Sequence, residues 1–400
     1  MAREHDPLFT LPPLPQSDWS ESNAQGKALW ASFWKRTHAR VPVRLNTNPR
    51  VLLLNPAYNT RGLTYEQYML DPEVMGQGIL EWSTWVRHFL PGDHEHGLPE
   101  AWPMYVDFEN TYDAAWLGCP VHFREGQVPD TTPFLTDDTK TALFDQGVPD
   151  PFAGEWPERF LAFADHWDKR RREGWTWMGR PIGPLLMPSY AGTDGVFTAA
   201  VAVRGATEFC SDLLLDPEYA HTLLGYLHEA TRARMRAWRR RFDIAIPCDD
   251  FWLADDAIQM LSPDQYREFV LPWHRKLYEE FATHTHRGMH LCGNDQRHFP
   301  VIREECGVSL FDTGFPVDFG AARRELGQHT VIQGGPKISF FLMDDPAPIV
   351  EETKRIAESG VLEGGCFVFQ EGNNLPPRAR LSTCEAFYDA AVAYGRIDRT

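Results

Sequence analysis

The sequence contains no apolar run long enough to cross a membrane. No stretch reaches about 18 uninterrupted apolar residues, which is near the minimum for a spanning helix. Residues 1–7 are mostly polar and lack the apolar centre of a secretory signal peptide. We therefore expect no transmembrane helix, no cleaved leader and no membrane partner.

Positive charge is also scarce. The chain has 39 Lys and Arg against 56 Asp and Glu, which gives a formal net charge of −17. Nucleic-acid binding requires clustered Lys and Arg that neutralise phosphates. The densest basic run, residues 232–241, follows a helical pattern typical of a solvated helix face. The composition therefore predicts no nucleic-acid partner.

A disulfide framework is missing as well. The seven Cys are odd in number and irregularly spaced, unlike the paired cysteines of secreted domains. Such usage is typical of a reducing compartment, so we expect a cytoplasmic protein.

The chain does contain enough apolar residues for a large core, because hydrophobic residues make up 43 % of it. From about residue 100, helical patterns alternate with strand-like runs at 104–108, 182–188, 244–248, 289–292, 308–311, 331–333 and 367–369. The clearest helix covers 217–242, with Asp216 as its N-cap and Pro217 at its first position. Such alternation predicts parallel strands joined by crossover helices.

These patterns predict the domain organisation. We expect an α/β fold, a single (β/α)8 TIM-like barrel over residues 41–400, because the strand count is near eight. Residues 1–40 form an N-terminal extension. A large insertion at about 120–180 is rich in Pro, Gly, Trp and charge and shows no clear hydrophobic period, which predicts an irregular segment.

The sequence His290-Leu291-Cys292-Gly293-Asn294 carries the clearest chemical signal. Two residues apart on a strand, His290 and Cys292 project from the same face. Imidazole and thiolate are ligands that zinc prefers. Their place at the end of a strand-like run predicts an active site, because β/α barrels put their chemistry there.

Other polar residues follow the remaining strand-like runs. Together they form a predicted polar ring of Asp107, Glu109, Ser189, Tyr190, Asp249, Asp250, His290, Cys292, Asp312, Gly334, Gly335, Glu371 and Asn373. A single one of these residues is explained by a turn or helix cap. Their repetition at one end of successive strands favours a functional site.

Several segments together resemble the uroporphyrinogen decarboxylase superfamily. They are residues 183–190, 216–218, 249–250, 260–274, 290–294 and 364–373, and the resemblance covers roughly 40–395. It implies a TIM-like barrel with one of two activities. One branch decarboxylates a tetrapyrrole without metal or cofactor, and the other transfers methyl groups between corrinoid proteins, thiols and methylated substrates with the help of zinc.

The resemblance is closer to the methyltransferase branch, because His290 and Cys292 match that branch's His-x-Cys zinc ligands. It implies a third ligand, for which Glu371 and Cys366 are the alternatives, and a site without metal also stays open. The implied function is zinc-dependent transfer of a methyl group between a methylated small molecule and a thiol or corrinoid acceptor. A corrinoid would be carried by a separate protein.

The remaining site residues are predicted by role. Asp249, Asp250, Asp312 and Tyr190 are the candidate catalytic residues, and Arg44, Asn46, Asp107 and Asn373 are the candidate substrate-binding residues. The two adjacent aspartates could share a proton or act as a general acid.

A metal-independent decarboxylase acting on a carboxylated substrate is the alternative. The Arg-rich signature of that branch is missing near residues 43–47. Arginines that converge on one pocket would favour this alternative, and Arg44, Arg61 and Arg204 are the candidates for them.

Overall fold

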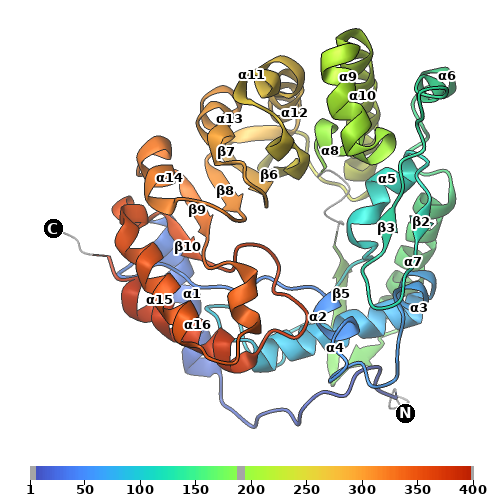
Figure 1. Cartoon of the computed structure of the whole chain (residues 1–400). Helices are drawn as coiled ribbons and strands as arrows, with labels where there is room; N and C mark the ends of the chain where they lie inside the picture. Colours follow the sequence, from blue (N-terminus) through green and yellow to red (C-terminus); the bar gives the residue numbers. More distant parts are fainter. Residues whose placement is uncertain (1–5, 187–193, 398–400) are drawn as a thin grey trace. The chain divides into compact units, whose positions relative to one another are not determined.

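The computed structural model describes residues 6–186 and 194–397. The chain divides into two compact units. Figure 1 labels the helices and strands of both. The first unit comprises Met1–Tyr105, His166–Leu186 and Asp312–Thr400. The second unit comprises Val106–Asp165 and Met187–Phe311.

Buried parallel strands form the centre of the first unit. Strand β9 (Val331–Gly334) pairs in parallel with β10 (Phe367–Phe369), so that Gly334 lies opposite Phe369. Val43 also pairs in parallel with Phe369. Both strands are buried along their whole length, as expected for β-branched and aromatic residues in a sheet covered on both faces.

Helices and short strands complete the first unit. They are α1 (Ser20–Trp34), α2 (Arg50–Leu53), α3 (Tyr65–Leu70), α4 (Pro72–Phe89), α14 (Phe319–Leu326), α15 (Ala347–Ile356), α16 (Leu381–Tyr394), β1 (Trp102–Met104), β4 (Thr176–Trp177) and β5 (Arg180–Leu185). Helix α4 begins at Asp71, whose carboxylate accepts hydrogen bonds from the backbone N–H groups of Glu73 and Val74. Such a cap satisfies donors that the first helical turn leaves unpaired.

The second unit contains the longest parallel strand pair. Strand β6 (Cys248–Ala254) pairs with β7 (Ala282–Leu291), and Ala254 lies opposite His290 near the C-terminal ends of both strands. Helices and short strands complete this unit: α5 (Tyr112–Trp116), α6 (Ala142–Gln146), α8 (Val196–Arg204), α9 (Ala206–Leu215), α10 (Pro217–Arg241), α11 (Pro263–Gln265), α12 (Leu271–Phe281), α13 (Phe299–Cys306), β2 (Val121–His122) and β3 (Asp130–Thr131). Strand β8 (Leu310–Thr313) and helix α7 (Glu155–Arg172) lie where the chain passes from one unit to the other.

Several predicted elements are confirmed. The strand-like runs 331–333 and 367–369 are β9 and β10. The helix predicted over 217–242 is α10, and Asp216 caps it by accepting from the backbone N–H of Tyr219. Among the described residues, β1–β5, β6–β7 and β9–β10 pair in parallel, whereas β2–β3 and β4–β5 pair in antiparallel fashion. The closed eight-stranded barrel stays a prediction.

Two predicted elements are wrong. The strand predicted at 244–248 begins only at Cys248 and runs on to Ala254, because the apolar half of the strand comes after its two aspartates. The irregular segment predicted for 120–180 contains the long helix α7. Its aromatic residues Trp156, Phe160, Phe163 and Trp167 recur at helical spacing and are buried, a periodicity that the many charges around them obscure.

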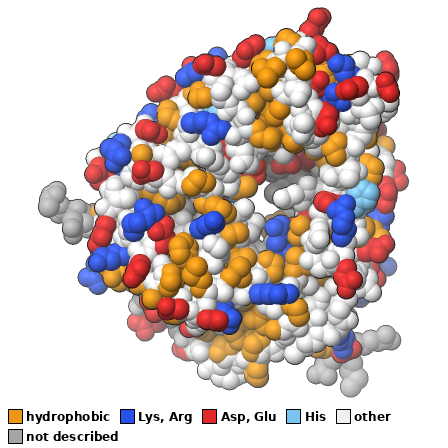
Figure 2. Space-filling view, in the orientation of Figure 1, with side chains coloured by type: hydrophobic (Ala, Val, Ile, Leu, Met, Phe, Trp, Pro, Cys, Tyr) orange, Lys and Arg blue, Asp and Glu red, His pale blue; other side chains and the backbone are white. Residues whose placement is uncertain are grey.

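No helix among the described residues is long and apolar enough to span a membrane. On the face shown in Figure 2, Lys and Arg side chains are scattered among Asp and Glu rather than gathered in one basic patch.

A buried ion pair stabilises the core of the second unit. The Arg234 guanidinium contacts both carboxylate oxygens of Asp113, at 2.7 and 2.8 Å, and lies 4.9 Å from the centre of the Trp116 ring. Both side chains are almost fully buried. Burial raises the pKa of Asp113, and the charge of Arg234 opposes that rise. An Arg cannot release its proton, so this guanidinium depends on its partner.

The substitution Asp113→Asn tests this dependence. We expect it to lower the free energy of unfolding by about 3–5 kcal/mol, because it leaves the Arg234 charge buried without its partner. The matched control is Asp165→Asn, whose carboxylate lies 3.8 Å from Arg241 at an exposed position. Urea denaturation should show little change for the control, and equal effects of the two variants would contradict the prediction.

Candidate functional site

Three potential metal ligands converge in the second unit. They are Asp256, in the 3-10 turn Asp256–Met260 that follows β6, His290, near the end of β7, and Cys292, just beyond it. One ligand atom from each side chain lies within 4.8 Å of the others. Parallel pairing of β6 and β7 causes this convergence, because it brings the two strand ends together.

Contacts within the Asp256–His290–Cys292 group fix its geometry. The Asp256 carboxylate accepts a hydrogen bond of 2.7 Å from the backbone N–H of Cys292, and one of its oxygens lies 3.9 Å from Nε2 of His290. Burial raises the pKa of the Cys292 thiol, Asp256 raises it further, and His290 opposes the rise. The protein alone therefore favours the neutral thiol, and a bound cation would favour the thiolate.

A buried hydrogen-bond chain lies next to the group. His274 bridges Tyr266, whose hydroxyl is 3.0 Å from Nδ1, and Asp255, whose carboxylate is 2.8 Å from Nε2. The Asp255 carboxylate also accepts from the backbone N–H groups of Phe197 and Thr198 in the first turn of α8. These hydrogen bonds fix Asp255, which is the residue directly before Asp256.

Gly195 leaves the space that the Asp255 carboxylate occupies. A Cβ atom at position 195 would overlap the carboxylate of Asp255. The backbone N–H of Gly195 donates to the carbonyl of Ala254, at 2.6 Å. The end of β6 thus lies directly against the start of α8.

Further carboxyl groups surround the Asp256–His290–Cys292 group. Burial raises the pKa of Asp295 to about 7, and the negative charge of Asp256 contributes to the rise. Neither carboxylate oxygen of Asp295 has a hydrogen-bond partner among the described residues. Burial, with the charges of Asp113 and Asp256, holds the pKa of Asp194 well above its usual range. Perturbed acids beside a ligand group are typical of functional sites, and this excess of negative charge suits a cation.

The structure does not bring Asp249 and Asp250 to this site. Both are exposed at the start of β6, whereas the Asp256–His290–Cys292 group follows the other end of that strand. Asp249 accepts hydrogen bonds from Thr283 and Thr285, and Asp250 accepts one from the indole N–H of Trp252. The expectation that they follow a strand is wrong, and with it the argument for their catalytic role.

Sequence reasoning missed Asp256. The apolar run 251–254 ends directly before Asp255 and Asp256. Assigning the strand to this run instead of 244–248 would have placed these two carboxylates at the strand end.

A second polar cluster belongs to the first unit, where Glu371 follows β10. One Glu371 oxygen accepts a hydrogen bond of 3.0 Å from the backbone N–H of Asn46. The Asn46 side chain donates to Gln370, as does Arg44, which also donates to Gln333. Asp312, on β8, accepts from the side-chain amide of Gln370.

Glu371 itself is fully buried, and its other oxygen has no hydrogen-bond partner among the described residues. Burial raises its pKa well above the usual value, Asp312 adds to this rise, and Arg44 opposes it. Glu371 belongs to this cluster and is not a member of the metal-ligand group, in which Asp256 is the third residue. Cys366 is likewise outside that group and precedes β10, with its thiol donating to the carbonyl of Gly364.

The other predicted residues are placed as follows. The Asp107 carboxylate accepts from the backbone N–H of Glu109, and the side-chain amide oxygen of Asn373 accepts from the backbone N–H of Asn374. Their substrate-binding roles stay predictions. Tyr190 lies outside the described residues.

Two of the three arginines that the decarboxylase alternative requires are paired with carboxylates of their own. Arg61 pairs with exposed Asp6, and Arg204 is buried against Asp212 and Asp137. Only Arg44 lies in the cluster around Glu371 and Gln370, so the described contacts give no support for three arginines that share one pocket.

Comparison with known proteins gives both activities among the relatives. A uroporphyrinogen decarboxylase from Thioalkalivibrio sulfidiphilus is 26 % identical over 293 residues, which is 68 % of this chain and 74 % of that protein. A methylated-thiol–coenzyme M methyltransferase from Methanosarcina mazei is 27 % identical over 219 residues, which is 54 % of this chain and 52 % of that protein.

Two further comparisons concern the fold and the family. A solved methyltransferase structure from Methanosarcina mazei matches with a TM-score of 0.61 at 16 % identity, over 92 % of this chain and 98 % of that one. This likeness shows a shared fold. The model of the uroporphyrinogen decarboxylase (URO-D) family matches residues 111–394. Because this match covers well over half of the chain, the chain belongs to the uroporphyrinogen decarboxylase family.

Proposed function

We propose that this protein is a zinc-dependent methyltransferase, which moves a methyl group from a methylated small molecule to a thiol or corrinoid acceptor. The observation that carries this proposal is the convergence of Asp256, His290 and Cys292. A relative that acts on methylated thiols supports it.

The donor set fits zinc. Carboxylate oxygen, imidazole nitrogen and thiolate sulfur are all zinc ligands, and three protein ligands leave one position open in a catalytic site. Asp256, His290 and Cys292 would hold the ion. Bound there, zinc would lower the pKa of a thiol in the open position and supply a nucleophile at neutral pH.

The surrounding residues prepare this site. Asp256 orients the backbone of Cys292, and the chain from Tyr266 through His274 to Asp255 holds the turn from which Asp256 projects. With a pKa of about 7, Asp295 is able to hold a proton or release it near neutral pH.

The transfer balances without an oxidant or reductant. For a methylated thiol as donor, the bond between its sulfur and the methyl carbon breaks, and a bond between the acceptor sulfur and that carbon forms. The donor leaves as a thiolate and takes up the proton that the acceptor thiol released. A corrinoid acceptor would arrive on a separate protein. The substrate-binding roles of Arg44, Asn46, Asp107 and Asn373 stay predictions from the sequence.

Metal content tests the ligand assignment. We expect the purified protein to bind about one zinc per chain, and Asp256→Asn and Cys292→Ser each to lower its zinc affinity by at least tenfold, because each removes a strong ligand. The control Asp249→Asn changes the same kind of residue at the other end of β6 and should keep full affinity. Metal analysis measures the zinc content, and competition with a chromogenic chelator measures the zinc affinity.

An equal loss of zinc affinity in the control Asp249→Asn would contradict the assignment of Asp256 and Cys292 as zinc ligands. If Glu371→Gln lost zinc and Asp256→Asn kept it, Glu371 would be restored as the third ligand.

Activity distinguishes the two branches of the family. We expect the zinc-loaded protein to convert a methylated thiol and an acceptor thiol into their exchanged products, with at least a hundredfold loss of rate in His290→Ala, because the metal loses a ligand. Mass spectrometry of both thiols follows the methyl group. If the protein, after a chelator has removed its metal, released carbon dioxide from uroporphyrinogen and transferred no methyl group, it would instead be a decarboxylase.

The raised pKa of Glu371 gives a pH-dependent prediction. Because burial raises this pKa above the usual value of 4.5, the folded state binds more protons than the unfolded chain, and the unfolding free energy falls as pH rises from about 4.5. We expect Glu371→Gln to weaken this decrease. The control is Glu351→Gln, at an exposed position, which should keep the wild-type slope in urea denaturation.

A further inference from the structure

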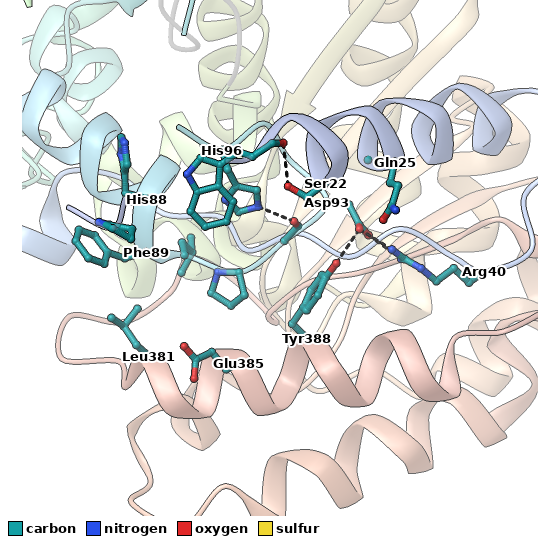
Figure 3. A pocket seen from close by; sticks show the side chains of 16 residues that line it. Ser22, Gln25, Arg40, His88, Phe89, Asp93, His96, Leu381, Glu385 and Tyr388 are labelled. Atoms are coloured by element: carbon teal, nitrogen blue, oxygen red, sulfur yellow. Dashed lines mark hydrogen bonds and ion pairs between the residues drawn. The ribbon is translucent and has the colours of Figure 1, made fainter. Parts of the chain in front are cut away.

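A pocket of about 460 Å³ lies within the first unit, outside both polar clusters described above. Its walls come from α1, from the end of α4 with the loop after it, and from α16 (Figure 3). The volume falls in the range of small-molecule sites. None of its lining residues belongs to the Asp256–His290–Cys292 group.

The strongest charges in the pocket wall neutralise one another. Arg40 binds Asp93 through two hydrogen bonds of 2.6 and 2.8 Å. The same carboxylate accepts from the hydroxyl of Tyr388, at 3.1 Å, and from the backbone N–H of Val43, at 2.8 Å. Arg40 and Asp93 therefore satisfy each other, and this pair leaves little positive charge for an anionic ligand.

Other side-chain donors in the wall are also engaged. The hydroxyl of Ser22 donates to the carbonyl of Trp19, and the amide of Gln25 donates to Glu21. The Nδ1–H of His88 likewise donates to the carbonyl of Thr84.

Glu385 gives the pocket its net charge. It is exposed on α16, has no ion-pair partner among the described residues and leaves the helix on the side that faces the pocket (Figure 3). Leu381, one turn earlier, supplies an apolar surface on the same helix. A carboxylate beside an apolar surface favours a ligand with one positive charge and an apolar body.

Aromatic rings add to this preference. The ring of Trp19 stacks on His96 with 4.9 Å between their centres, and Phe89 and Tyr388 also line the pocket. Aromatic faces attract organic cations through their quadrupoles, and Trp does so most strongly.

We propose that this pocket binds a small organic ammonium ion with a flat apolar body. Glu385 pairs with the ammonium group, the face of Trp19 attracts the same cation, and the ring of Phe89 covers the apolar part. The site is separate from the proposed methyl transfer and does not depend on it.

Binding of phenethylammonium to the full chain tests the proposal, with 2-phenylethanol and phenylacetate as its neutral and anionic analogues. Isothermal titration calorimetry in about 0.15 M salt, which limits long-range attraction to the acidic chain, should give a Kd for the ammonium ion at least tenfold below that of either analogue. Glu385→Gln should remove this preference, and Trp19→Leu should weaken binding of the ammonium ion severalfold.

The control is Asp389→Asn, which removes the same charge one turn further along α16 at an exposed position outside the pocket lining. It should keep the wild-type preference. Equal binding of the three compounds, a preference that survives in Glu385→Gln, or an equal loss in Asp389→Asn would overturn the proposal. His290→Ala should bind phenethylammonium as the wild type does, so failure of the proposed metal site would be visible separately.

Discussion

The carboxylate of Asp255 is the contact on which the candidate metal site depends. It accepts from the first turn of α8, through Phe197 and Thr198, and from His274 of α12. This buried carboxylate thereby joins α8 and α12 to the end of β6, with four hydrogen bonds when the hydroxyl of Thr198 is included. A buried carboxylate is stable only when its oxygens are paired in this way. Because Asp256 is the next residue, the position of this candidate metal ligand follows from the hydrogen bonds of Asp255.

The buried carboxyl groups of the two units have different surroundings. In the second unit, carboxyl groups gather around His290 and Cys292, and their mutual repulsion is relieved by Arg234, by protonation or by a cation. In the first unit, the groups around Glu371 are mainly amides, together with the guanidinium of Arg44. The former arrangement gains most from a cation, whereas the latter favours the neutral form of the acid.

The sequence was a good guide wherever a short-range rule decides the structure. Asp216 followed by Pro217 predicted the start of α10, and the apolar runs of β9 and β10 predicted buried strands. His290 and Cys292 were found from their spacing on a strand. Asp256 was not, because its place depends on the register between β6 and β7, which pairs residues 36 positions apart, such as Ala254 and His290. The cluster of Glu371 with Asn46 and the pocket at Glu385 depend on still longer separations.

Glycine at position 195 has a consequence for how this protein can change over time. Its missing side chain gives the Asp255 carboxylate room, while its own N–H bonds to the end of β6. Any larger residue there would push the acid away from α8 and His274, and a smaller residue at 255 would leave the donors of that helix unpaired in the core. A substitution at either position is therefore expected to be tolerated only together with a change at the other.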